Sequence, residues 1–164
     1  MDAQTKKIIW SQLGAAIDTL ENAINHCPDS LWGDMSKSHP FWYVTYHTLF
    51  WLDFYFSDDI KNFNPPEPFG MEEIDPAGVM PERPYSKDEL LTYLVHGKKK
   101  SKEFIDSMTE EKSQEQFEFG RVKLTYAELL LYKMRHVQHH AAQLNMILRK
   151  ETNSAPGWVF HGKQ

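Results

Sequence analysis

The segment at residues 134–149, MRHVQHHAAQLNMILR, carries three histidines within five positions. His136 and His140 are four positions apart, so on an α-helix they lie one turn apart on the same side. Two imidazoles in this arrangement can bind one metal ion, as they do in helices with an HExxH motif. Val137 stands where that motif has its catalytic glutamate, so a zinc-peptidase mechanism is not indicated. The pair indicates a metal site that needs at least one more ligand.

His47 is the candidate for the third ligand. It falls on an aromatic stripe of a predicted helix, with residues spaced by four and three positions. The stripe consists of Tyr43, His47, Phe50 and Phe54. An imidazole in such a stripe should be buried or half-buried, which costs free energy unless the ring finds a polar partner. A metal ion shared with His136 and His140 would be that partner.

Two simpler interpretations stay open from the residues alone. An imidazole on an aromatic helix can be held by ordinary hydrogen bonds, and histidine pairs four apart also occur on solvated helix faces. In a bundle without metal, all three histidines would need such bonds. The other five histidines are expected to be surface residues that bind no metal: His26, His39, His96, His139 and His161.

Length and composition predict one globular domain over residues 1–164. Hydrophobic residues make up 41% and charged residues 25% of the chain, as in ordinary globular proteins. A chain of 164 residues can form a core without disulfides. The net charge of -5 argues against binding to a nucleic-acid backbone. The basic run Lys98 to Lys100 is expected to lie on a solvated helix face.

Cysteine content and hydropathy bear on the compartment. Cys27 is the only cysteine, which excludes an intrachain disulfide and a thiolate zinc cluster and fits a reducing cytoplasm. The start of the chain has no secretory signal pattern. The most apolar segment, residues 41–56, carries His47 and Asp53 and is too short and aromatic to span a bilayer. We therefore expect a cytoplasmic protein without a membrane partner.

Apolar periodicity and capping signals predict four long helices. The first ends near Cys27-Pro28, the second runs over residues 41–60 after Pro40, the third over 86–108 and the fourth over 125–150. The last two begin with capping boxes, in which a hydroxyl residue is followed three positions later by a glutamate. These pairs are Ser86 with Glu89 and Thr125 with Glu128.

The connections complete the predicted fold. Six prolines between residues 62 and 85 require a long crossover between the second and third helices. The segment 116–125, QFEFGRVKLT, is not assigned to a sheet, because two short strands with no further partner would be unstable. Trp158 and Phe160 in the tail are expected to pack back on the bundle. The prediction is an all-α four-helix bundle with a long Pro-rich crossover.

The same residues resemble a known family. An aromatic helix with a central histidine, HPFWYVTYHTLFWLDFYF, a Pro-rich crossover, FGRVKLTYAELLL and the final HVQHHAAQL are similar to the DinB/YfiT-like superfamily over nearly the whole chain. The most specific part is the element matched by His136, His140 and Gln143 together with the distant His47. In place of the glycine-rich NHGTHHRGQ of that family this chain has RHVQHHAAQ, without the Gly and the Arg.

The resemblance implies a metalloenzyme. It implies a divalent metal, most often zinc or nickel, held by His47, His136 and His140, with water completing the shell and a frequent homodimer. Family members with known activity include transferases and isomerases that use mycothiol, bacillithiol or glutathione. Because the Gly and the Arg of the family element are missing here, the substrate of this chain stays open. No catalytic residue is assigned.

Two classes of function follow. The first is a metal-dependent enzyme, either a thiol transferase or isomerase or a hydrolase, that acts on a small molecule and activates a thiol or a water. Its pocket would be lined by aromatic residues such as Trp42, Tyr46 and Trp51, unless these are plain core, and Gln143 or Tyr46 would orient a ligand. The alternative is a non-catalytic, metal-stabilised binding or stress-response bundle, in which the ion only ties two helices together.

Overall fold

The computed structural model describes residues 1–36 and 39–163 and confirms an all-α four-helix bundle. Its long helices are α1 (Ala3–His26), α3 (Phe41–Tyr55), α4 (Lys87–Ser107) and α6 (Tyr126–Thr152). Short elements connect them: α2 (Asp29–Trp32), the 3-10 helix η1 (Glu72–Ile74), α5 (Glu110–Gln114), β1 (Gln116–Phe119) and β2 (Val122–Thr125). Within the described residues, no helix is both long and apolar enough to cross a membrane.

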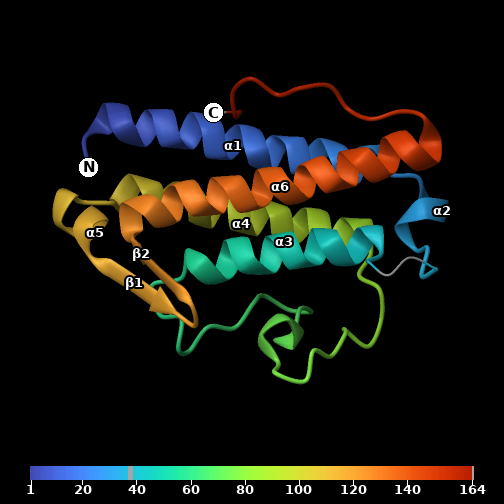
Figure 1. The fold of residues 1–164 in the computed structure, drawn as a ribbon, viewed down its shortest axis with the longest axis horizontal. Helices are drawn as coiled ribbons and strands as arrows, with labels where there is room; N and C mark the ends of the chain where they lie inside the picture. Colours follow the sequence, from blue (N-terminus) through green and yellow to red (C-terminus); the bar gives the residue numbers. More distant parts are fainter. Residues whose placement is uncertain (37–38, 164) are drawn as a thin grey trace.

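The long crossover determines the direction of the helices. Helix α1 packs against α6 and α4, and α3 packs against the same two helices. The crossover between α3 and α4 returns along the length of the bundle, so α4 runs in the same direction as α3 (Figure 1). Helices α3 and α6 run in opposite directions (Figure 1). This arrangement brings the middle of α3 beside the middle of α6.

The predicted helix boundaries are largely confirmed. Helix α1 ends at His26, just before Pro28, and both capping boxes are formed at the starts of α4 and α6. In each box the hydroxyl accepts from the backbone N–H of the glutamate, and the glutamate carboxylate accepts from the backbone N–H of the capping residue. These caps fix where α4 and α6 begin.

Helix α3 is buried on almost every side. Of its fifteen residues, twelve are buried, and the remaining three are Tyr43, His47 and Trp51. These three are spaced by four, so they form one stripe along the helix. The face on which His47 lies is therefore the one face of α3 that is not fully buried.

The second helix is shorter than its apolar pattern predicted. Residues 41–60 were expected to be helical, whereas α3 ends at Tyr55. Phe63 is buried and its ring packs at 5.2 Å from the ring of Phe54. Burying Phe63 there requires the chain to turn back along the helix that it has just left, so the crossover begins earlier than expected.

The segment 116–125 forms a β-hairpin, so the expectation of no sheet was wrong. Strands β1 and β2 pair antiparallel with Phe119 opposite Val122, and Gly120 takes a positive φ of 56° in the turn. The hairpin is stable without further strands because it packs on helices. Phe117 is buried, and its ring contacts those of Tyr55 and Tyr126.

The C-terminal tail returns over α1, but its aromatic residues do not pack as expected. Trp158 and Phe160 are 70% and 74% exposed. The tail is held instead by its backbone, through Gly162 N–H donating to the Ser11 carbonyl at 2.9 Å and Lys163 N–H donating to Asp18 at 2.7 Å. These two bonds fix the end of the tail and leave both aromatic rings facing solvent.

Candidate metal centre

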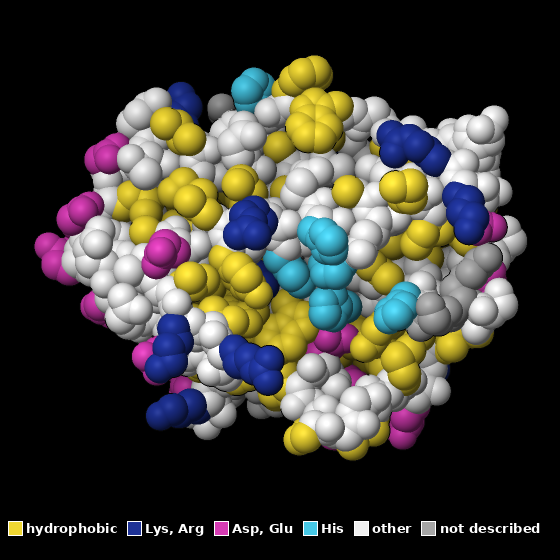
Figure 2. Space-filling view, in the orientation of Figure 1, with side chains coloured by type: hydrophobic (Ala, Val, Ile, Leu, Met, Phe, Trp, Pro, Cys, Tyr) yellow, Lys and Arg dark blue, Asp and Glu magenta, His cyan; other side chains and the backbone are white. Residues whose placement is uncertain are grey.

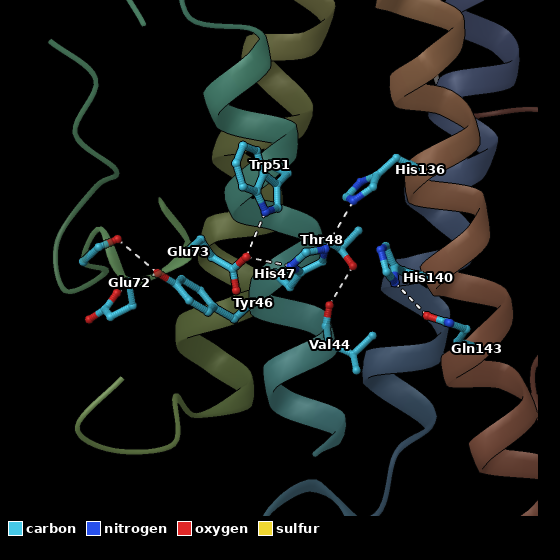
Figure 3. Close-up of polar contacts among 11 residues, drawn as sticks. Val44, Tyr46, His47, Thr48, Trp51, Glu72, Glu73, His136, His140 and Gln143 are labelled. Atoms are coloured by element: carbon cyan, nitrogen blue, oxygen red, sulfur yellow. Dashed lines mark hydrogen bonds and ion pairs between the residues drawn. The ribbon is translucent and has the colours of Figure 1, made fainter. Parts of the chain in front are cut away.

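Helices α3 and α6 bring His47, His136 and His140 together. One ligand nitrogen from each ring lies within 4.8 Å of the other two. Figure 3 shows the rings of His136 and His140, from successive turns of α6, facing His47 on α3. The ring centroids of His47 and His140 are 4.8 Å apart, and those of His136 and His140 are 4.6 Å apart. The three residues predicted as ligands therefore form one cluster.

Neighbouring side chains orient two of the three rings. His47 Nδ1 lies 2.7 Å from Glu73 Oε2, and His140 Nδ1 lies 2.7 Å from Gln143 Oε1 (Figure 3). Both partners are acceptors, so each Nδ1 carries the proton and each Nε2 keeps a free lone pair. A metal-bound histidine typically donates its other N–H to such an acceptor.

The spacing of the free nitrogens fits a metal ion. His47 Nε2 and His136 Nε2 are 3.4 Å apart. Two nitrogens at roughly 2.0–2.1 Å from one tetrahedral ion lie about 3.3–3.4 Å from each other. Because Glu73 holds the proton of His47 on Nδ1, its Nε2 lone pair faces His136. An ion between the two nitrogens would satisfy both lone pairs.

The electrostatic environment keeps His136 and His140 neutral. Burial is the main cause that lowers the pKa of His136 to about 2 and that of His140 to about 4, and the neighbouring basic groups act in the same direction. Neutral imidazole is the form that binds a metal ion. Lys133, one turn before His136, is fully buried, and desolvation lowers its pKa well below the usual range. Its amine lies 4.0 Å from the centre of the Tyr55 ring.

Glu73 is a site residue that the sequence did not indicate. It comes from η1 in the crossover, and its side chain is only 4% exposed. Besides His47, the Trp51 indole N–H donates to its carboxylate at 2.8 Å. Burial alone would raise the pKa of Glu73, but the hydrogen bonds from His47, Tyr43 and Trp51 lower it, so the carboxylate is ionised. The crossover thus covers the open stripe of α3 with one carboxylate.

A cavity of about 830 Å³ opens beside the histidines. His47, His140, Gln143 and Glu73 are among its lining residues, and so are several apolar side chains of α3 and α6. Its size is that of a pocket for a small ligand. In Figure 2 the histidines gather at the middle of this face, with hydrophobic side chains next to them.

The aromatic residues proposed for the pocket have other positions. Trp42 and Tyr46 are buried in the core. The Tyr46 hydroxyl donates to Glu72 at 2.8 Å and to the Gly70 carbonyl at 3.0 Å, so it anchors the crossover and orients no histidine. Trp51 binds Glu73, and the aromatic residue that lines the cavity is Tyr43.

The five remaining histidines lie outside the cluster, as predicted. All of them are exposed: His26, His39, His96, His139 and His161. His96 Nε2 lies 3.3 Å from Asp53, which was not foreseen. His139 is not part of the cluster, but it lines the cavity.

Comparison with known proteins identifies the family. The family model of the DinB superfamily matches residues 12–144, a range that includes the three histidines, Glu73 and Gln143. Searches of curated proteins and of solved structures gave no match. Because the match covers most of the chain and agrees with the observed bundle, the protein belongs to the DinB superfamily.

Proposed function

We propose that His47, His136 and His140 bind one divalent metal ion and that the protein is a metal-dependent enzyme acting on a small molecule. The observation that carries this proposal is the convergence of three imidazoles in which His47 and His140 are held with Nε2 unprotonated. Zinc and nickel are the proposed ions, since both suit nitrogen ligands. Three ligands from the protein leave coordination positions open to the cavity.

The chemistry proposed is activation of a thiol or a water. A divalent ion in such a site lowers the pKa of a bound thiol or water toward neutrality. The residues of this chain supply the rest: Glu73 and Gln143 hold two ligand rings in place, and the cavity wall positions the second reactant. We favour a thiol-dependent transferase or isomerase over a hydrolase because the wall of the cavity is largely apolar, which suits contact with the organic part of a second reactant.

The cavity also supports one of the two classes of function over the other. In a bundle where the ion serves only to tie α3 to α6, the histidines would be closed off on all sides. Here a space of about 830 Å³ adjoins them. This supports an enzyme over a non-catalytic metal-stabilised protein.

The proposal extends to the cellular compartment and the oligomeric state of the protein. We propose a cytoplasmic single-domain protein, because the one cysteine, Cys27, is free and buried. We also propose a homodimer, for which large hydrophobic side chains exposed on α1, α6 and the tail provide contact surface. Examples are Ile8, Leu131, Trp158 and Phe160.

A thiol-transfer assay tests the enzymatic part. The zinc- or nickel-loaded protein would be mixed with a low-molecular-weight thiol and an aromatic halide, and thioether formation followed by absorbance. We expect a rate above the uncatalysed reaction that is lost in His47→Ala. Equal rates for the wild type and for His47→Ala, with metal bound to the former, would contradict the proposal of thiol activation.

A further inference from the structure

Five residues of the cavity lining form an apolar wall beside its histidines, which include His39 and His139. It is formed by Tyr43 and Val44 of α3 and by Ala142, Met146 and Ile147 of α6. No lysine or arginine is among the described residues that line this cavity. In Figure 2 hydrophobic side chains lie directly to the right of the central histidines, and the nearest basic side chains lie to their left. A ligand in the cavity therefore meets apolar surface away from the metal centre.

The described lysine and arginine residues near the cavity do not line it. Arg135 lines a neighbouring hollow, which shares His139 and Ala142 with the cavity, and is not among the residues that line the cavity itself. Lys133 is fully buried and is not among the residues that line this cavity. Lys37 is outside the described residues.

The two positive charges of a bound divalent ion are balanced without a carboxylate on the ligand. Glu73 lines the cavity, and its carboxylate lies 2.7 Å from His47 Nδ1 and accepts from the Trp51 indole N–H at 2.8 Å. A divalent ion carries two positive charges, of which Glu73 neutralises one and a bound thiolate neutralises the other. A carboxylate elsewhere on the ligand would lie against apolar side chains with no lysine or arginine among the described lining residues, and an anion that loses solvation without a cationic partner is costly.

Gln143 offers the ligand one polar contact. Its Oε1 lies 2.7 Å from His140 Nδ1, and His140 can bind a metal through Nε2 only if Oε1 is the acceptor there. The amide NH₂ is thereby fixed as a donor on a residue that lines the cavity, and it makes no hydrogen bond to any described residue. It can donate to an uncharged acceptor such as a carbonyl oxygen.

We propose that this cavity takes an uncharged ligand with an apolar body, one donor atom for the metal and a carbonyl-type acceptor, and that it selects against carboxylate-bearing ligands. This inference rests on the proposed function, since it places the ligand at the metal centre. It narrows the substrate class to neutral, largely apolar molecules.

The test compares two probes of the same shape. The cobalt(II)-loaded protein is titrated with 4-(sulfanylmethyl)benzamide and with 4-(sulfanylmethyl)benzoate, and binding is followed by the sulfur-to-cobalt absorption band. The two thiols differ in charge and hardly in size. We expect the amide to bind at least tenfold more tightly than the carboxylate.

Variants locate the cause. Met146→Lys places a cation on the cavity wall and should reduce or reverse the preference for the amide. Val95→Lys adds the same charge on an exposed position of α4 that does not line the cavity, and should leave the preference unchanged.

The outcomes separate this inference from the proposed function. Failure of the wild type to take up cobalt, or equal uptake by His47→Ala, would contradict the metal site before any probe is added. With cobalt bound through His47, equal or tighter binding of the benzoate, or binding of neither thiol, would overturn the inference. An equal response of both lysine variants would show that the cavity wall does not set the preference.

Discussion

Helix α3 carries two polar clusters that differ in how their groups are paired. On the side of α4, the Asp53 carboxylate is 1% exposed and accepts from the Tyr93 hydroxyl at 3.0 Å, lies 3.3 Å from His96 Nε2 and forms an ion pair with Lys100. On the side of α6, His47 and His136 place their Nε2 atoms 3.4 Å apart. His136 Nδ1 is buried and has no hydrogen-bond partner in the described part of the chain.

The difference indicates separate roles for the two clusters. Buried polar groups that are fully paired stabilise a fold, and buried groups that lack partners point to a ligand or a function. The Asp53 carboxylate has its hydrogen-bond and ion-pair partners within the protein, so we assign this cluster to stability. The His47 cluster leaves its facing Nε2 atoms with only a long contact and His136 Nδ1 without a partner among the described residues, so we assign it to binding.

The largest expected effect is the loss of stability on breaking the Asp53 cluster. Asp53→Ala removes the acceptor of three side chains, and deleting one partner of a buried ion pair typically costs about 3–5 kcal/mol. Because Lys100 is partly exposed, we expect about 3 kcal/mol by urea denaturation of the metal-free protein. Metal content of the folded variant should be unchanged.

The control for this comparison is His47→Ala measured without metal. It should cost less than Asp53→Ala, since Glu73 keeps the Trp51 indole N–H as a donor and His47 Nε2 has only the long 3.4 Å contact with His136 Nε2. If the two variants lost equal stability without metal, the assignment of separate roles would be wrong.

A smaller effect is expected from the carboxylate behind His47. Glu73→Gln keeps the shape of the side chain but removes the charge that holds the proton on His47 Nδ1. Loss of such a supporting residue typically lowers metal affinity about 10–100-fold. A competition titration with a chromophoric chelator measures this. Glu72→Gln, which alters a crossover carboxylate bound to Tyr46 and not to a histidine, is the matched control and should leave metal affinity unchanged.

The pH dependence of the metal-free protein gives a third prediction. In the unfolded chain His136 and His140 have the usual pKa of 6.5, and in the folded protein burial lowers these values to about 2 and about 4. Below pH 6.5 the unfolded chain binds protons that the folded protein does not, so the free energy of unfolding falls as the pH drops from 6.5 toward 4.

The change in the free energy of unfolding with pH has an upper limit. Each histidine contributes at most about 1.4 kcal/mol per pH unit. The slope should be shallower in a His136→Gln/His140→Gln variant, measured by denaturation at several pH values. The same slope in both proteins would show that these imidazoles are not kept neutral by the fold.

The smallest effect is expected at Gln143. Its side chain is exposed and uncharged, so Gln143→Leu should weaken metal binding less than Glu73→Gln, by under about tenfold. The same chelator titration checks this. A loss larger than that of Glu73→Gln would reverse the order of importance that burial and charge suggest.

Sequence patterns predicted the parts of the site that lie on regular helices. The spacing of His136 and His140, and the position of His47 in an aromatic stripe, follow from helical geometry, and the caps at Ser86 and Thr125 fix where α4 and α6 begin. These features are local, so the amino-acid sequence determines them without knowledge of the tertiary fold.

The rest depended on contacts between distant segments. Glu73 lies in a Pro-rich crossover with no periodicity that could indicate its direction, and only the path of that crossover brings it to His47. Similarly, the basic run Lys98 to Lys100 was expected on a solvated helix face. Only Lys99 is mostly exposed, since Lys98 pairs with Asp18 and Lys100 pairs with Asp53. One long-range signal was available: an acidic residue in a crossover that covers a predicted histidine site is a candidate partner for that histidine.

The central claim is that the three histidines hold one metal ion. The most direct measurement is elemental analysis of protein purified without an affinity tag or chelator, beside its His47→Ala variant, both after incubation with zinc and nickel salts. We predict about one divalent ion per chain in the wild type and loss of that ion in the variant. No bound metal in either protein, or equal metal in both, would contradict the claim and leave a bundle whose histidines only pack.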